Sequence, residues 1–286
     1  MHTTAVSLFV QPAGQDSVTE TAPEVPKSAQ QGLLEGLRTH GASEDVSCER
    51  FQRIRQAVLN QSRHIRTANF TTIHTDDLQF LLKTYDEGFF SGLINQAMAE
   101  TPIRFRLSTR MTSAGGKTAR FRNRSGDVSY EIAIAGGLLF QGFGEQDRGI
   151  RVCGLECESR LDALMHIFEH ELVHLIEFLC WGVSDCSGSR FQNIATRHFM
   201  HRTHTHELIT WKERALNSGI RRGARVAFDF EGRRLHGRVS RITKRATVLV
   251  EDPQGLPYSD GRRYRTYYVP IRLLEPASAT PAIPCV

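Results

Sequence analysis

The chain has 286 residues, of which 40% are hydrophobic and 23% are charged, a composition typical of globular proteins. No apolar run approaches the roughly 20 residues that a membrane-spanning helix needs, and the first thirty residues lack the basic start and apolar block of a signal peptide. The six cysteines are scattered along the chain, which suits a reducing compartment. We therefore expect a cytoplasmic protein with no membrane partner.

Residues 1–30 are rich in Thr, Ser, Pro, Gln and Glu without periodicity, which predicts a disordered N-terminal tail. In residues 31–74 the apolar side chains of Phe51, Ile54 and Val58 recur at helical spacing. This region is expected to form a helical N-terminal extension of one or two amphipathic helices.

Residue 75 opens the next unit with TDDLQFLLKTY, a helix start followed by an apolar face, and the glycines of YDEGFFSG are expected to end this helix. The stretches IRFRLSTR, TARFRN and VSYEIAIA alternate polar and apolar residues between Gly- and Ser-rich breaks. They predict three strands of a short antiparallel sheet.

A long amphipathic helix is predicted to begin after Ser159, which is an N-cap residue with Asp162 three positions later. Gly182 is expected to close it, and a further helix is expected from about Ser189 to His198. The long helix therefore carries the motif HELVH at residues 170–174.

His170 and His174 are four residues apart, so a helix presents both imidazoles on one face, as a zinc ion requires. Glu171 stands beside the first ligand and is the expected general base, which accepts a proton from a zinc-bound water for attack on a carbonyl. The motif therefore predicts a Zn²⁺ cofactor and hydrolytic chemistry.

A competing register overlaps this motif, because HIFEH reads as HxxEH from His166, Glu169 and His170. Histidines at i, i+4 and i+8 do not easily chelate one ion, since the outer pair is about 12 Å apart along the axis. One register must prevail, and spacing alone leaves the choice open. His166 would otherwise lie beside the ligands or face the substrate.

Four segments in order, namely YDEGFFSG, RFRLSTRMTSAGGKT, YEIAIA and the HELVH helix, resemble the SprT-like family of zinc metalloproteases, which includes Spartan. The similarity runs from about Leu78 to Ala195. It implies an α+β, gluzincin-like domain over residues 75–210, with a helical N-terminal layer, a short sheet and the metal helix beneath a substrate cleft. It also implies proteolysis near DNA, since the eukaryotic relatives cleave proteins crosslinked to it.

The resemblance assigns His170 and His174 as the first two ligands and Glu171 as the base. The family then has a histidine in an HGxxF motif, but here SGSRF places Ser187 at that position. The first candidate for a replacement is Cys186, one residue earlier, because a thiolate is a strong zinc ligand. The alternatives are the carboxylate of Asp185 and the more distal histidines, which are His201 first, then His204 and His206.

Basic residues concentrate near the C-terminus, where residues 211–275 hold fifteen Lys and Arg against seven Asp and Glu, a balance of +8. Short strands separated by turns predict a small barrel over 211–276, with a tail at 277–286. The segment resembles an SH3-like or KOW-like module, with HGRVSRI as its KOW element and Val226, Phe228 and Phe230 in its core. Nearby tyrosines such as Tyr264, Tyr267 and Tyr268 could add stacking contacts. The residues expected to bind nucleic acid are Arg233, Arg234, Arg238, Arg241, Lys244, Arg245, Arg262 and Arg263.

The sequence thus predicts a zinc metallopeptidase whose basic module delivers it to nucleic acid or to proteins bound or crosslinked to it, placing it at the nucleoid if the partner is DNA. The alternative is a non-catalytic nucleic-acid-binding protein whose zinc site is degenerate. A purely structural site with four protein ligands also stays open, as does the choice between DNA and RNA.

Overall fold

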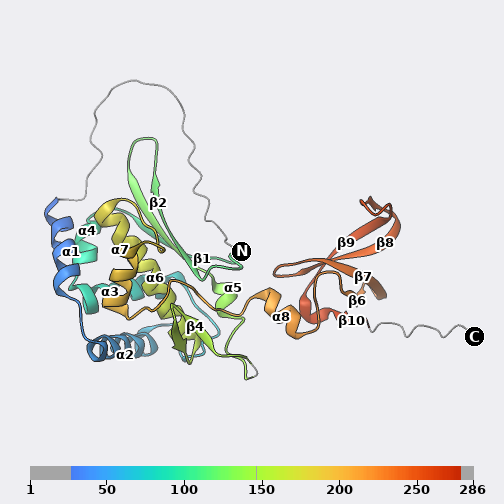
Figure 1. Cartoon of the computed structure of the whole chain (residues 1–286), viewed down its shortest axis with the longest axis horizontal. Coiled ribbons are helices and arrows are strands. Elements are labelled where there is room, and N and C mark those ends of the chain that lie inside the picture. The colour runs from blue at the N-terminus through green and yellow to red at the C-terminus, as the bar shows by residue number, and fades with distance from the viewer. Residues whose placement is uncertain (1–26, 146, 278–286) are drawn as a thin grey trace, which may run out of the picture.

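The computed structural model describes residues 27–145 and 147–277 of an α+β chain. Residues 1–26 of the predicted N-terminal tail and residues 278–286 of the predicted C-terminal tail lie outside the described residues. Residues 27–30 belong to the first helix, which corrects the expected end of the N-terminal tail. The N-terminal part contains, in chain order, α1 (Lys27–Thr39), α2 (Glu44–Gln61), α3 (Thr75–Phe90), α4 (Leu93–Met98), β1 (Ile103–Leu107), β2 (Gly116–Arg122), β3 (Val128–Ile134), α5 (Gly136–Leu139), β4 (Ile150–Val152), β5 (Leu155–Cys157), α6 (Arg160–Trp181) and α7 (Ser189–Phe199) (Figure 1).

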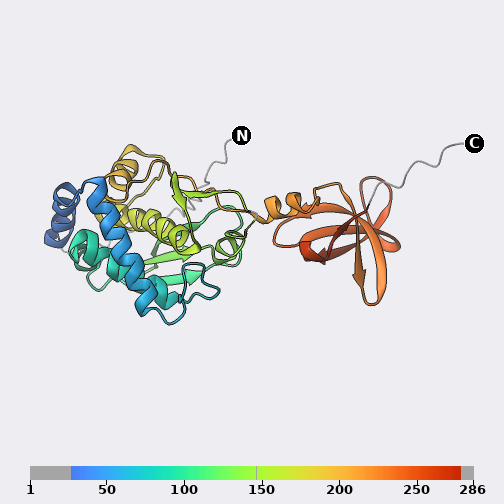
Figure 2. The same ribbon diagram turned by 90° about the horizontal axis from the view of Figure 1, so that it is seen from below.

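One hydrophobic core unites the helices of the N-terminal part. Phe51, Ile54 and Val58 of α2 are buried in it, as their spacing predicts, and α1 contributes Leu33 and Leu37. The helix α6 contacts α1–α5, α7 and β2–β5, and it lies in the middle of this part in Figure 2. The N-terminal extension therefore packs into the same core as the helix that carries HELVH.

The three predicted strands form one sheet in the order β1-β3-β2, but this sheet is mixed rather than antiparallel. A short turn joins β2 to β3, so these two strands are antiparallel. Since β1 pairs with the other edge of β3 in the same direction, β1 and β3 are parallel. The physical reason is that residues 108–115 carry the chain across the sheet before β2 begins, so β1 and β2 are never neighbours.

Both ends of α6 follow the sequence signals. The side chain of Ser159 accepts a hydrogen bond from the backbone N–H of Asp162, and Gly182 ends the helix with φ 71°, a left-handed conformation that glycine adopts without strain. The helix α7 begins at Ser189, so a short loop, residues 183–188, connects the two helices. This loop contains Cys186 and starts one residue beyond the closing glycine.

After α7 the chain turns back toward α6 and runs beside the β4–β5 hairpin. The backbone N–H of Cys153 donates to the carbonyl of Thr205 at 2.8 Å, and the N–H of Glu207 donates to the carbonyl of Arg151 at 2.8 Å. Val152 and His206 form an isolated antiparallel bridge. Because β4 packs against α6, this pairing brings His206 to the metal helix.

The C-terminal part has a second hydrophobic core and a five-stranded antiparallel sheet in the order β10-β6-β7-β8-β9. Val226 and Phe228 are buried in this core as predicted, but Phe230 is 45% exposed, because it lies at the end of its strand, where its ring packs against that of Tyr267. The elements of this part are α8 (Trp211–Asn217), β6 (Arg225–Phe230), β7 (Arg233–Ile242), β8 (Ala246–Pro257), β9 (Arg263–Val269), the short 3₁₀ helix Ile271–Leu273 and β10 (Glu275–Pro276).

Across residues 27–145 and 147–277, every helix is too short or too polar to cross a lipid bilayer.

Candidate metal centre

His170 and His174 face each other on adjacent turns of α6, with their Nε2 atoms 3.2 Å apart. Zinc–nitrogen bonds of 2.0–2.1 Å in a tetrahedral site place two ligand nitrogens about 3.3 Å apart. The separation of the two imidazole nitrogens therefore fits two corners of a zinc coordination tetrahedron. HELVH, and not the overlapping HxxEH, is the register that forms such a pair.

The Nδ1 atom of His174 lies 2.6 Å from Ser184 Oγ, and that hydroxyl donates to Glu177 Oε2 at 2.6 Å. Since the hydroxyl proton is used toward Glu177, Nδ1 is the donor to Ser184, and the neutral ring keeps a lone pair at Nε2. Burial lowers the pKa of His174 to about 4, so the ring is neutral at pH 7. The hydrogen-bond chain therefore selects the tautomer that a metal ligand needs.

His170 is buried, and its Nδ1 atom lies 3.7 Å from the sulfur of Cys153, which also lies 3.9 Å from the carbonyl of His166. Burial, followed by the influence of His206, lowers the pKa of His170 far below its ordinary value. Burial likewise raises the pKa of Cys153, so its thiol is protonated and can donate to the His166 carbonyl. The sulfur is then an acceptor for the Nδ1 proton of His170, which leaves Nε2 of this ring free as well.

Cys186 lies beside the HELVH pair as a candidate third donor. One ligand atom each from His170, His174 and Cys186 lie within 4.8 Å of one another. The loop that carries this cysteine is held by Glu177, which accepts hydrogen bonds from the backbone N–H of Asp185 and from Arg190. Burial raises the pKa of the half-buried Cys186 thiol, so binding of a metal ion there would release a proton.

The two oxygen side chains on either side of Cys186 do not join this group. Asp185 Oδ1 accepts hydrogen bonds from the backbone N–H and the hydroxyl of Ser187, at 2.9 and 2.7 Å, and Ser187 itself is exposed. The structure therefore uses Asp185 to shape the loop and does not bring it to the imidazole pair.

The distal histidine that was expected first, His201, is not placed with the HELVH pair either. Its Nε2 atom lies 3.0 Å from Glu169 Oε2, to which His166 Nδ1 also bonds at 2.7 Å, while Tyr85 donates to the other carboxylate oxygen at 2.8 Å. The three groups are joined directly by hydrogen bonds and form a further group of possible donors, separate from the HELVH pair. The hydrogen bonds and charges of His166 and His201 outweigh burial and lower the pKa of Glu169 to about 2.

Because residues 205–207 pair with β4, a different histidine, His206, lies beside His170. The ring of His206 lies 4.8 Å from that of His170, and together with Cys153 these residues form a second group of possible ligands. The Nε2 atom of His206 is buried and has no hydrogen-bond partner among the described residues. His204 is exposed. The sequence ranked His201 before His206 because it could not anticipate the pairing of residues 205–207 with β4, which brings His206 beside His170.

Glu171 points toward β2 rather than into solvent. The hydroxyl of Thr118 lies 2.8 Å from Glu171 Oε2, and a Cβ atom on Gly116 would come within 2.5 Å of Oε1. Burial raises the pKa of Glu171 to about 8. The glycine in the strand is therefore what gives this carboxylate its room.

The predicted nucleic-acid-binding residues divide into two kinds. Arg234 pairs with Asp229 and Glu275, and Arg262 with Glu251. Arg263 donates to the carbonyl of Gly255 at 2.8 Å. No described acid lies within 4.0 Å of the charged groups of the others, which are Arg233, Arg238, Arg241, Lys244 and Arg245, all of them exposed. Of Tyr264, Tyr267 and Tyr268, only Tyr268 is largely exposed. Tyr267 packs on Phe228, and the hydroxyl of Tyr264 donates a hydrogen bond to Asp260.

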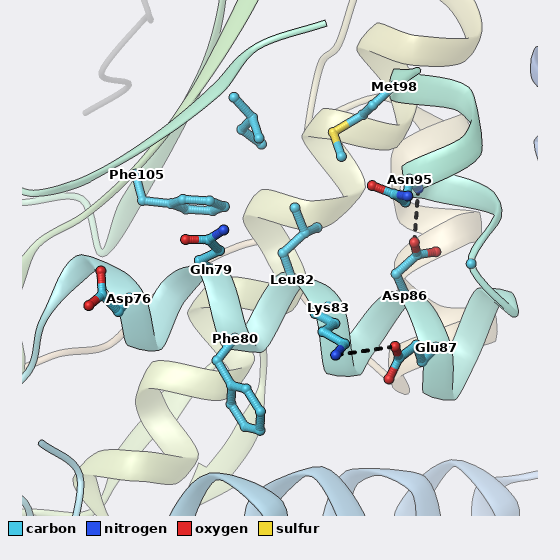
Figure 3. Close-up of a pocket in the computed structure, with 12 residues that line it drawn as sticks. Asp76, Gln79, Phe80, Leu82, Lys83, Asp86, Glu87, Asn95, Met98 and Phe105 are labelled. Atoms are coloured by element: carbon cyan, nitrogen blue, oxygen red, sulfur yellow. Dashed lines mark hydrogen bonds and ion pairs between the residues drawn. The ribbon is translucent and has the colours of Figure 1, made fainter. Parts of the chain in front are cut away.

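A separate cavity of about 660 Å³ lies between α3, α4 and β1 (Figure 3). Asp86 on its wall accepts hydrogen bonds from the backbone N–H groups of Ile94 and Asn95, and Lys83 lies 3.9 Å from Glu87. Phe105 of β1 projects into this space above α3 in Figure 3. The cavity is lined by no histidine or cysteine, so it is not part of the metal centre.

Comparison with known proteins gave no match to a family model, to a curated protein or to a solved structure.

Proposed function

We propose that the chain is a zinc-dependent peptidase of the SprT-like type that acts on proteins bound or crosslinked to nucleic acid. In this proposal the N-terminal part has a gluzincin-like fold, and the C-terminal sheet is an SH3-like barrel that contacts the nucleic acid. The observation that carries it is the facing pair of imidazole nitrogens on α6, 3.2 Å apart, with Cys186 as a nearby third donor.

The donor set supports zinc as the ion. Two neutral imidazoles and one thiol are typical zinc ligands, and His174 is oriented by a hydrogen-bonded hydroxyl and carboxylate, as metal-binding histidines usually are. Three protein donors leave a fourth position for water or substrate, which is the pattern of catalytic sites. When bound, zinc would supply a Lewis acid that polarises a carbonyl oxygen and acidifies a water ligand.

Glu171 is the residue proposed to accept and return the proton during hydrolysis. Its ordinary carboxylate pKa would make it a weak base, and burial beneath β2 raises that pKa to about 8, nearer to the working range of a general base. Thr118 holds the carboxylate by donating to Oε2. Because Gly116 has no Cβ, its backbone can approach the other oxygen, Oε1, without a clash.

The strand β2 offers a place for an extended substrate. Among the described strands it pairs only with β3, so its outer edge has free backbone groups, and it passes directly over Glu171 at Gly116. A peptide that adds to this edge would receive main-chain hydrogen bonds with little dependence on its sequence. The amide bonds of this peptide would then lie beside the Glu171 carboxylate.

The test is the substitution Glu171→Gln in the full chain, with the exposed Glu158→Gln as a matched control. Glu171→Gln is expected to keep stoichiometric zinc and to lose cleavage of a protein crosslinked to DNA, while Glu158→Gln cleaves normally. Cleavage by Glu171→Gln at the wild-type rate would refute the assignment.

One observation favours a second candidate, a non-catalytic nucleic-acid-binding protein with a structural zinc site. The unpartnered Nε2 atom of His206 lies in a buried position near His170 and could serve as a fourth protein donor. A site with four protein ligands has no open position for water. Wild-type protein that contains zinc but cleaves no protein substrate, free or crosslinked, would favour this candidate.

A further inference from the structure

Three surface depressions in the C-terminal part form one continuous path. The depression between α8 and β7 shares Arg221 and Arg222 with a second one, and the second shares Arg225 and Ala277 with a third that crosses β6 and β7. Seven cationic side chains line this path, and Arg262 among them is paired with Glu251. We call the other six the basic track: Lys212, Arg221, Arg222, Arg225, Arg238 and Arg241.

The fold aligns these residues from separate segments of the sequence. The register between β6 and β7 places Arg225 directly opposite Arg238, so both side chains point to the same face of the sheet. The packing of α8 against β7 brings Lys212 into the same depression as Arg241. Two residues of the track, Lys212 and Arg225, are absent from the basic residues that charge and sequence alone placed on the surface of this module.

The charges of the track are not neutralised within the part of the chain that the structure describes. All six side chains are exposed, and none has a carboxylate within 4.0 Å or a side-chain hydrogen bond. By contrast, Arg234, Arg262 and Arg265 of the same C-terminal part each pair with an acidic residue. Acidic residues line the path only at its far end, where Glu251 and Asp260 stand beside Arg262 and Tyr264.

We infer that the basic track is the surface that binds the phosphodiester backbone of a nucleic acid. A row of unpaired cations suits a polyanion, because each phosphate that is neutralised releases condensed counterions. Leu216, which is half-exposed, and Ile242 lie in the first depression and offer apolar contact for sugars or bases. This inference rests on the proposed function and specifies where on the chain the nucleic acid binds. DNA and RNA present the same phosphodiester chemistry, so the experiment separates them.

The test compares two triple variants of the full chain that remove the same charge from the same sheet region. The track variant is Arg221→Gln, Arg222→Gln and Arg241→Gln, and the control is Arg234→Gln, Arg262→Gln and Arg265→Gln. Binding to single-stranded DNA, duplex DNA and RNA of matched sequence is measured by fluorescence anisotropy over a series of salt concentrations. Circular dichroism and thermal unfolding establish that both variants are folded.

The track variant is expected to reduce the magnitude of the slope of log binding constant against log salt concentration by about 2 for single strands and by nearly 3 for duplex DNA. Its affinity is expected to fall roughly tenfold or more. The control should keep most of the wild-type affinity and slope. Equal losses in the two variants would overturn the track, because net charge alone would then explain binding. Absence of wild-type binding to all three nucleic acids would overturn the track and the delivery part of the proposed function, and it would leave the peptidase part to the Glu171→Gln experiment.

Discussion

His174 and Glu177 are linked through a single hydroxyl: Ser184 Oγ lies 2.6 Å from His174 Nδ1 and 2.6 Å from Glu177 Oε2. Glu177 is 1% exposed and also holds the backbone of Asp185 and the guanidinium of Arg190. One buried carboxylate therefore orients the imidazole of His174 and shapes the loop that contains Cys186.

Glu177→Gln is expected to weaken zinc binding by roughly 10- to 100-fold, because the amide holds His174 and the loop less firmly. Competition with a chromophoric chelator measures the zinc affinity. The rate at which Cys186 reacts with a maleimide in metal-free protein should rise as the loop loosens. Zinc affinity and thiol reactivity equal to those of the control Glu158→Gln would contradict the role of this carboxylate.

Gly116→Ala is expected to lower cleavage about 100-fold, because its Cβ would come within 2.5 Å of Glu171 Oε1 and displace the carboxylate. Zinc content should be unchanged, since the atoms nearest to the added Cβ all belong to Glu171 and not to an imidazole of the pair. Gly137→Ala is the control, as a Cβ there meets nothing within 4 Å. Full activity in the Gly116→Ala protein would show that the position of Glu171 beneath β2 has no bearing on catalysis.

Glu169→Gln is expected to destabilise the chain by about 2 to 3 kcal/mol at pH 7, because a buried carboxylate with three hydrogen-bond partners is lost. The folded-state pKa of Glu169 is about 2, below the unfolded value of 4.5. Its contribution is therefore complete above pH 4.5 and is lost as the pH falls toward 2.

Urea unfolding of metal-free protein at several pH values measures this difference. The gap in unfolding free energy between wild type and Glu169→Gln should narrow between pH 5 and pH 3. A gap that stays constant over this range would mean that the Glu169 carboxylate is not stabilised in the folded chain.

Cys186→Ala should weaken zinc binding far more than His206→Asn, because only Cys186 groups with both imidazoles of the pair. Loss of one of three protein donors leaves a two-histidine site. Isothermal titration with Zn²⁺ measures both affinities. The reverse order would assign His206 as the third ligand and would favour the group formed by Cys153, His170 and His206.

The local parts of this fold follow from the sequence. Ser159, Asp162 and Gly182 define both ends of α6 through capping chemistry, which involves only neighbouring residues. The helical spacing of α2 likewise places its buried residues correctly. The facing arrangement of His170 and His174 is a direct result of their separation by one turn.

What the sequence could not provide depends on contacts between distant segments. The parallel pairing of β1 with β3 is set by a crossover in residues 108–115 that carries no periodic signal. His206 reaches α6 only through backbone hydrogen bonds with β4. The separation of paired from unpaired arginines in the C-terminal sheet depends on which acid lies opposite each one.

X-ray absorption at the zinc edge of the zinc-loaded full chain tests the central claim most directly. One sulfur at about 2.3 Å and two or more nitrogen or oxygen atoms at about 2.0 to 2.1 Å are expected from His170, His174 and Cys186. A shell of nitrogen and oxygen alone, or a chain that takes up no stoichiometric zinc, would contradict it.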